Sequence, residues 1–283
     1  AFLQKDYAKA NNLYTEAIKE GIDEPNYALY QQAIIAGVNN DEAAKLSYLN
    51  TIINAGNSPY QDAALLEIAN TKLMNRQMQE AAAMLQQLVN TTKNESVKAT
   101  AMYKLAYVYQ EQTNLPKAKE YYQLFIEQYP AATDRGAAME ALRLLYVNEG
   151  DFEGYLAYAE AKSLPALDEL TQQQSYFEVA EQEFDQQQWS SAVAKLSSFL
   201  NTYPNSNYKT AATYYRGVAQ ANLKNNEAAL IDYDTVIALG WNEYAEDANM
   251  KAATIAQAQK NNLAVVNYYE NILEFSSNET FKL

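Results

Sequence analysis

The segment MYKLAYVYQEQTNLPKAKEYYQLFIEQYP, residues 102–130, contains the pattern that decides the fold. Its small residue Ala118 is followed four positions on by Tyr122 and three positions further by Phe125. Steps of four and three return to the same side of a helix, so these side chains predict a helix with one buried stripe. A second small residue, Ala106, lies twelve positions before Ala118 and predicts a preceding helix that packs closely against the first.

The same pattern of a small residue followed by two larger apolar ones recurs along the chain. It reads Ala10-Tyr14-Ala17, Ala44-Tyr48-Thr51, Ala81-Leu85-Leu88, Ala192-Leu196-Phe199, Ala229-Tyr233-Val236 and Val265-Tyr269-Ile272. The steps from Ala44 to Ala81, from Ala81 to Ala118 and from Ala192 to Ala229 are each 37 residues, and Ala118 to Ala192 is twice that. A period held in phase over the whole chain indicates a repeat protein.

Each repeat is predicted to be a pair of antiparallel helices. The small position of the first helix, twelve residues before that of the second, is occupied by Ala69, Ala106, Ala180, Gly217 and Ala253. Short polar turns such as Thr113-Asn114, Gly150-Asp151 and Asn225-Asn226 separate the two helices. With only 8 glycines and 6 prolines in 283 residues, the composition also favours an all-α fold.

These residues resemble the tetratricopeptide repeat. Leu105, Ala106, Tyr109, Leu115, Ala118, Tyr122, Phe125 and Pro130 each stand at the position that the family's pattern gives them. The resemblance implies an all-α, right-handed superhelical solenoid of about seven helical hairpins with a leading half-repeat. It covers residues 1–283 as a single domain.

Two units depart from the pattern. In the fifth unit the phase places Arg143 and Tyr155 at the close contact, and a slip of one residue would place Leu142 and Gly154 there instead. We expect the slipped register, with a change of curvature between residues 150 and 168; an ordinary irregularity that the superhelix tolerates is the alternative. In the second unit Gln32 stands at the small position with Ala33 beside it, so either residue could make the contact.

One stretch resembles a narrower branch of the family. Residues 199–208, FLNTYPNSNY, are followed by Ala211, Ala212, Tyr214 and Gly217, as in bacterial envelope members associated with outer-membrane protein assembly and with the Tol–Pal system. The resemblance implies a periplasmic or outer-membrane-associated location, with the cytoplasm as the alternative. The chain starts Ala1-Phe2-Leu3, so we expect any targeting segment to have been removed or to lie upstream.

Composition argues against several kinds of function. A formal charge of −14 repels nucleic-acid phosphates and anionic lipid, and no stretch reaches the about 18 apolar residues of a membrane span. The chain has neither histidine nor cysteine, so it lacks the commonest general base, nucleophiles and zinc ligands. We therefore expect no enzyme activity, no cofactor, no metal site, no nucleic-acid binding and no membrane insertion.

The candidate binding residues follow from the resemblance, which implies that one face of each first helix lines a concave groove. Projected on to this chain, that face holds Tyr103, Tyr107, Gln110, Glu140, Leu144, Phe177, Glu181, Tyr214 and Val218. Aromatic rings with isolated polar groups suit a protein-binding groove as well as internal packing, and both interpretations stay open. Some family members hold a peptide carboxylate with lysine, but here Leu66, Tyr103, Phe177 and Tyr214 stand at that position, which argues against such a clamp.

The leading hypothesis is a noncatalytic scaffold that binds other proteins or peptide segments in a bacterial cell envelope. One alternative is a structural segment of a longer repeat protein that self-associates through uncapped ends, because the leading half-repeat lacks its first helix. Another is carbohydrate or small-molecule binding, since Tyr, Asn and Gln also hold sugars.

Overall fold

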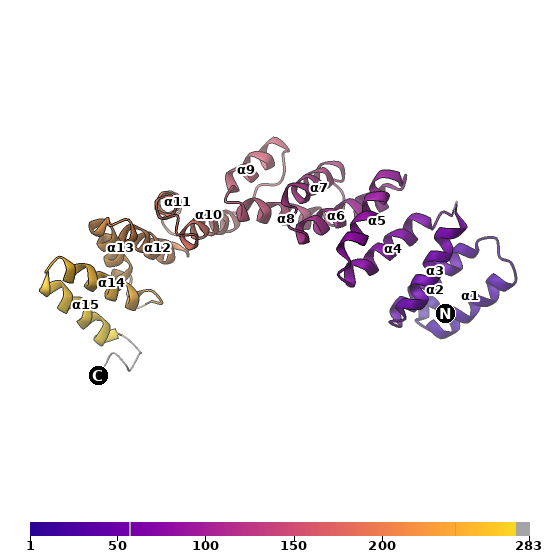
Figure 1. The fold of residues 1–283 in the computed structure, drawn as a ribbon, viewed down its shortest axis with the longest axis horizontal. Coiled ribbons are helices and arrows are strands. Elements are labelled where there is room, and N and C mark those ends of the chain that lie inside the picture. The colour runs from indigo at the N-terminus through magenta and orange to yellow at the C-terminus, as the bar shows by residue number, and fades with distance from the viewer. Residues whose placement is uncertain (57, 241, 276–283) are drawn as a thin grey trace. The chain divides into compact units, whose positions relative to one another are not determined.

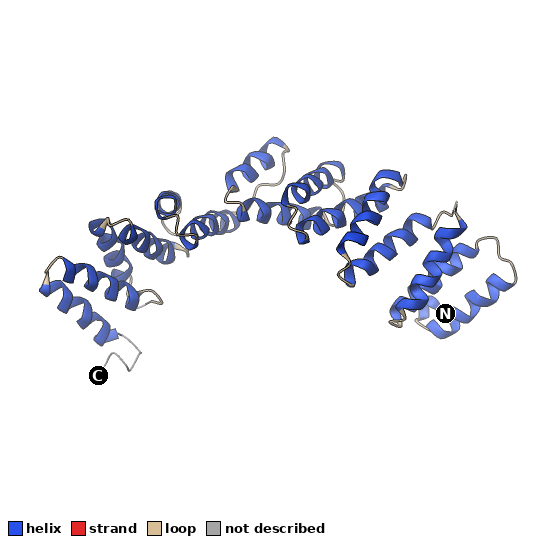
Figure 2. Ribbon diagram, viewed as in Figure 1, coloured by secondary structure: helices blue, strands red, loops and turns tan. Residues whose placement is uncertain are grey.

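The structure, a computed structural model, describes residues 1–56, 58–240 and 242–275 (Figures 1 and 2). These ranges contain 15 α-helices and one short 3-10 helix, η1 (Phe2–Gln4), and no strand. The all-α fold class is therefore confirmed. The chain divides into two compact units, Ala1–Leu142 and Arg143–Leu283, and the division falls within helix α8 (Arg135–Asn148).

The first unit is a run of antiparallel helices in which each helix packs on its neighbours in sequence. The unpaired helix α1 precedes three hairpins, α2–α3, α4–α5 and α6–α7, as the leading half-repeat predicts (Figure 1). The helices are α1 (Tyr7–Lys19), α2 (Pro25–Val38), α3 (Glu42–Ala55), α4 (Gln61–Met74), α5 (Met78–Thr91), α6 (Glu95–Glu111) and α7 (Leu115–Gln128).

The second unit continues the alternation with the hairpins α10–α11, α12–α13 and α14–α15. The end of α8 meets α9, where the Tyr146 and Tyr155 rings lie 6.0 Å apart between centroids. The helices after α8 are α9 (Phe152–Ala161), α10 (Glu169–Asp185), α11 (Trp189–Thr202), α12 (Lys209–Asn222), α13 (Asn226–Ala238), α14 (Ala245–Ala258) and α15 (Asn262–Phe275). With the hairpins of the first unit and α8–α9, the seven predicted hairpins are all present.

Most of the predicted small residues lie at the helix crossings. Those of the first helices (Ala69, Ala106, Ala180, Gly217 and Ala253) and four of the second helices (Ala81, Ala118, Ala192 and Ala229) are buried. The predicted pattern Ala44-Tyr48-Thr51 is wrong by one residue, because Thr51 is exposed and α3 buries Leu49 and Ile52 instead. At Gly217 there is little space for a side chain, because a Cβ atom there would lie 3.0 Å from both Asp232 Cβ and Tyr233 Cε1. The close approach of α12 and α13 therefore requires glycine at this position.

Every hairpin turn contains one residue in the left-handed conformation. These residues follow one another at intervals of 36 or 37 and are Asn40, Arg76, Thr113, Gly150, Gln187, Lys224 and Lys260. At Thr113 the backbone N–H donates to the Gln110 carbonyl at 2.9 Å, and that of Asn114 donates to Tyr109 at 2.8 Å. This pair of bonds is the Schellman motif, which satisfies the last carbonyls of the first helix.

The expected slip in the fifth unit is wrong. Gly150 adopts the left-handed turn conformation in phase with the other hairpins, and Tyr155 is 1% exposed, as the unslipped register requires. Gly154, which the slip placed at the helix contact, instead faces the carboxylate of Asp151 that caps the start of α9. Arg143 is buried nonetheless, because its guanidinium donates to Ser175 Oγ at 2.6 Å. A change of curvature between residues 150 and 168 stays a prediction.

In the second helical repeat, both residues that could occupy the small position, Gln32 and Ala33, are buried. Ala33 lies in the core with Leu49 and Ile52, so it makes the close contact. Gln32 points to the preceding helix, where its amide donates to Thr15 Oγ1 at 2.9 Å. A polar residue is tolerated there because α1 supplies an acceptor.

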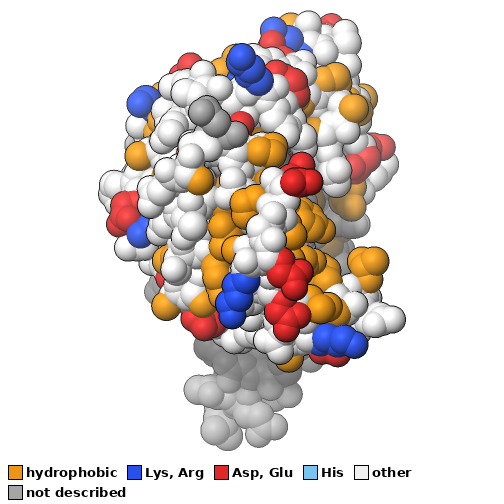
Figure 3. Space-filling view, turned by 90° about the vertical axis from the view of Figure 1, so that its right-hand side faces the viewer, with side chains coloured by type: hydrophobic (Ala, Val, Ile, Leu, Met, Phe, Trp, Pro, Cys, Tyr) orange, Lys and Arg blue, Asp and Glu red, His pale blue; other side chains and the backbone are white. Residues whose placement is uncertain are grey.

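Apolar side chains are exposed at both ends of the described chain. Near the N-terminus Leu3 is 97% and Leu13 50% exposed, and Figure 3, which views the side on which α1 lies, shows apolar side chains gathered among acidic ones. On α15, Tyr269 is 50% exposed, so its expected packing role is wrong. The reason is that no helix in residues 1–56, 58–240 and 242–275 follows α15.

Candidate functional site

In the first unit, two of the four predicted binding residues have contacts within the fold and two are exposed to solvent. Tyr103 packs within its own hairpin, with ring centroids 5.4 Å from Phe125 and 6.1 Å from Tyr122. Gln110 accepts a hydrogen bond from the Tyr122 hydroxyl at 3.0 Å. Tyr107 on α6 is 39% exposed, and Glu140 on α8 is exposed. Of the four, Tyr107 and Glu140 are therefore the most accessible.

In the second unit, Leu144 and Val218 do not line the cavity that Phe177 and Glu181 share. Leu144 on α8 is 37% exposed, whereas Val218 is half-buried in the cluster around Tyr233 and Val236. Phe177 and Glu181 line one hollow together, and Tyr214 supports a ring that lines it.

We call this cavity the first-helix hollow, because the first helices of two successive hairpins, α10 and α12, form it together with the residues that precede a third, α14. Its volume is about 510 Å³, within the range of ligand-binding pockets. Helices α10 and α12 and the residues just before α12 and α14 line it. The lining residues are Phe177, Glu181, Asn207, Tyr208, Thr210, Ala211, Asn242, Glu243 and Tyr244.

Stacked aromatic rings form the walls of the first-helix hollow. The Phe177 and Tyr208 rings are stacked with centroids 4.8 Å apart, and Tyr244 stacks on Tyr214 at the same distance. Tyr215 joins the two pairs, since its ring lies 6.1 Å from Phe177 and 5.9 Å from Tyr244. Rings locked by mutual stacking present a rigid surface that loses little entropy on binding.

Two carboxylates, Glu181 and Glu243, stand among these rings. Burial, followed by the negative charge of Asp185, raises the pKa of Glu181, while a hydrogen bond from Tyr215 opposes that rise. Burial and then hydrogen bonding to Tyr244 raise the pKa of Tyr215. Tyr244 in turn has a raised pKa, with burial as the main cause and Glu243 among the others. The phenols thus stay neutral and act as hydrogen-bond donors at neutral pH.

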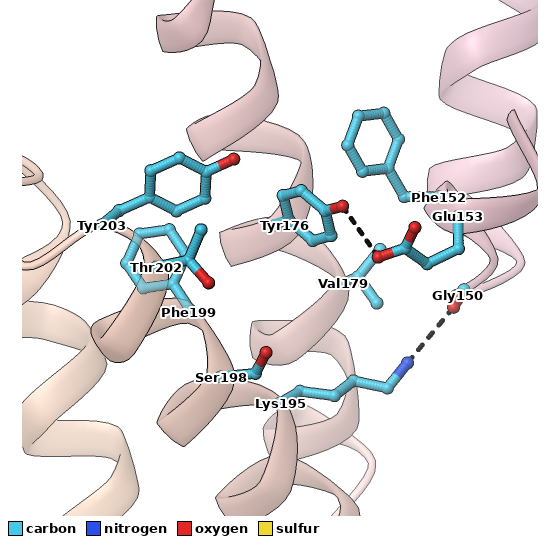
Figure 4. Close-up of a pocket in the computed structure, with 10 residues that line it drawn as sticks. All are labelled: Gly150, Phe152, Glu153, Tyr176, Val179, Lys195, Ser198, Phe199, Thr202 and Tyr203. Carbon is cyan, nitrogen blue, oxygen red and sulfur yellow. Dashed lines mark hydrogen bonds between the residues drawn. The ribbon is translucent and has the colours of Figure 1, made fainter. Parts of the chain in front are cut away.

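A second, smaller cavity lies between α9 and α11, with α10 as its floor (Figure 4). This α9–α11 cleft has a volume of about 250 Å³ and is lined by Gly150, Phe152, Glu153, Tyr176, Val179, Lys195, Ser198, Phe199, Thr202 and Tyr203. Sequence reasoning missed it. The available signal was the group of glycines at Gly136, Gly150 and Gly154 beside Pro165, which accompanies a helix α9 of only 10 residues.

The charged groups of the α9–α11 cleft, Glu153 and Lys195, each have a partner within the fold. The Tyr176 hydroxyl donates to Glu153 Oε1 at 2.7 Å (Figure 4). The Lys195 ammonium donates to the Gly150 carbonyl at 3.2 Å and pairs with Glu183 at 3.2 Å. A ligand here would have to compete with these contacts, so the first-helix hollow is the better candidate for binding.

No group of three or more Asp and Glu side chains that could hold a metal ion occurs in the described part of the chain. In the same residues, no helix is both long enough and apolar enough to cross a membrane. Rigid rings with hydrogen-bonded carboxylates form a surface suited to recognition.

Comparison with known proteins agrees with the repeat architecture. The family model described as tetratricopeptide repeat matches residues 100–132, which span most of α6–α7, and residues 174–206, which span most of α10–α11. The chain is thus a helical-hairpin repeat protein, with one segment that matches the tetratricopeptide repeat model in each of its two units. Among curated proteins, none matches the sequence.

Several solved structures are similar to the chain at low identity. A tetratricopeptide repeat protein from Parabacteroides merdae is 15% identical over 91% of this chain and 96% of that one, with a TM-score of 0.43. The C-terminal part of a repeat protein from Cytophaga hutchinsonii is 15% identical over 99% and 95%, with a TM-score of 0.43. The TPR2AB domain of yeast Sti1 in complex with pHSP90 is 16% identical over 91% and 95%, with a TM-score of 0.41. No functional conclusion follows from likenesses of this size.

Proposed function

We propose that the protein is a noncatalytic scaffold that binds other proteins, and that a partner segment docks in the first-helix hollow. The main support is the hollow itself, in which two successive hairpins and the residues before a third bring together rings and carboxylates that are far apart in the sequence. Tetratricopeptide repeat proteins generally act as protein-interaction scaffolds. Aromatic side chains in rigid, partly buried positions are the residues that dominate protein-binding energies.

A displayed library of random twelve-residue peptides tests this proposal. We expect the whole chain to select peptides, and Tyr244→Ala to weaken the selected peptides about tenfold or more, as for a central aromatic contact. Tyr27→Ala is the matched control, because Tyr27 also contacts two rings, Tyr14 and Tyr60, but lies on α2 in the first unit.

The outcomes of this selection separate the possibilities. Loss of binding in Tyr244→Ala alone supports both the scaffold and the site. Equal retention by both variants would exclude the first-helix hollow as the docking site. Failure to select any peptide, together with binding of glycans on an array, would replace the scaffold with the carbohydrate-binding alternative.

We further propose that the scaffold coordinates partners in a bacterial cell envelope. The support is the resemblance of residues 199–217 to envelope members of the family. Cell fractionation with an antibody against the native protein provides the test. Recovery with periplasmic or outer-membrane fractions is expected, and recovery with the cytoplasmic fraction alone would refute this location.

Self-association through the ends is a second candidate, favoured by the exposed face of α15. Leu263, Val266, Tyr269 and Leu273 follow one another at helical spacing and are each at least 50% exposed. Light scattering over a range of concentrations should detect dimers, and Val266→Glu should abolish them while the exposed control Asn267→Glu should not. A monomer at every concentration would rule this candidate out.

A further inference from the structure

The first-helix hollow has an uncompensated negative charge. Its nine lining residues include Glu181 and Glu243 and no lysine or arginine. Two basic side chains of α12 and α14 form ion pairs elsewhere, since Arg216 pairs with Asp232 at 2.6 Å and Lys251 with Asp247 at 3.4 Å. Lys209 begins α12 but does not line the hollow.

The position of Glu181 makes this charge costly in the absence of a ligand. The side chain is half-buried, with Glu178 and Asp185 on the same helix adding repulsion. Tyr215 supplies one hydrogen bond and no positive charge. The attraction of a positive group in the hollow would offset part of the desolvation penalty of Glu181 and part of the repulsion from its neighbours.

The aromatic walls fit the same kind of group. Phe177, Tyr208 and Tyr244 line the same hollow as the two glutamates; Phe177 and Tyr208 stack on each other, and Tyr244 stacks on Tyr214 behind it. The negative face of an aromatic ring attracts an ammonium or guanidinium group within about 6 Å. The chain already contains one such contact, since the Lys117 ammonium lies 5.0 Å from the centre of the Tyr109 ring.

We propose that the first-helix hollow binds a lysine or arginine side chain of an extended, positively charged partner segment, held by the carboxylates of Glu181 and Glu243 and by the rings of Tyr208 and Tyr244. This inference rests on the proposed function and specifies the chemistry of the partner. In this proposal the first-helix hollow is negatively charged and binds a cation, whereas a lysine clamp is positively charged and binds a carboxylate.

Fluorescence anisotropy with defined peptides tests the inference. One labelled twelve-residue peptide alternates lysine with serine, and a second carries acetyl-lysine at the same positions, which removes the charge and keeps most of the side chain. The lysine peptide should bind the whole protein about tenfold or more tighter, and added salt should weaken it. Equal binding of the two peptides would overturn the inference.

Matched variants separate the hollow from the general acidity of the protein. Glu181→Gln with Glu243→Gln should weaken the lysine peptide about tenfold, as expected for the loss of two partly buried charge contacts. Glu160→Gln with Glu270→Gln removes the same charge from exposed positions on α9 and α15 and should change binding less than about twofold. Equal losses in the two double variants would show only nonspecific attraction and would refute the site.

The two proposals can fail independently. Peptides selected from the random library without enrichment in lysine or arginine, but weakened by Tyr244→Ala, would refute the cationic occupant and leave the scaffold function intact. Selection of no peptide, with no binding of the lysine peptide, would refute both.

Discussion

Replacing Gly217 with alanine should destabilise the protein, although alanine is the better helix former. In an exposed helix interior, Gly→Ala stabilises by about 1 kcal/mol. At Gly217, however, the new Cβ would lie 3.0 Å from Asp232 Cβ and from Tyr233 Cε1. Neither neighbour can move easily, because Tyr233 is fully buried and two hydrogen bonds from Arg216 hold the Asp232 carboxylate. Overpacking of this kind costs about 1–3 kcal/mol, which exceeds or cancels the gain.

Gly37→Ala provides the comparison. Gly37 also lies in a helix, α2, but its nearest neighbour would be Lys45 Cδ at 3.4 Å, an ordinary van der Waals distance at which nothing has to move. The free energy of unfolding, measured by urea denaturation followed by circular dichroism, should be about 1–3 kcal/mol lower in Gly217→Ala than in Gly37→Ala. Gly217→Leu should be less stable still. Equal stabilisation by the two alanine variants would refute the close α12–α13 packing.

Three further changes test other features. Thr113→Gly should raise the free energy of unfolding by about 1 kcal/mol, because a β-branched residue is strained at φ 56°; a lower urea midpoint would contradict this. Arg216→Met leaves the Asp232 carboxylate buried without its partner and should cost about 3–5 kcal/mol, and a smaller effect than Lys251→Met would contradict that. Glu181→Gln should raise the melting temperature at neutral pH and have little effect in acid. Burial raises the pKa of Glu181 in the folded state, so its ionisation destabilises the fold as pH rises through that pKa. A difference independent of pH would refute this assignment.

Much of the fold could be predicted from the sequence because the repeat is expressed in a few packing residues. Ala106 and Ala118 are fully buried at their helix crossing, and the turn between them falls where the polar pair Thr113-Asn114 predicts it. The fifth unit was misread because small size was taken as the only way to fit a helix contact. Tyr155 instead fills that place with its ring, which packs against Tyr146 and Phe152.

The candidate site could be predicted only in part. Projection from the small positions located Phe177 and Glu181, because both lie on a regular helix. It could not locate Tyr208, Glu243 or Tyr244, which come from the segments just before α12 and α14 and follow no helical period. Sequence alone also could not show that Tyr103 packs on Phe125 within its own hairpin, since the two lie in different helices.

The left-handed turn residues have a consequence for engineering heat tolerance. Six of the seven are not glycine, and all six are exposed to solvent, away from the helix crossings and from both cavities. Neighbouring members of the series stand a full repeat apart in sequence and share no partner, so the effects of glycine substitutions at them should add. Glycine could therefore be introduced at these turns one after another, and each substitution should raise the melting temperature further while the binding surfaces stay unchanged.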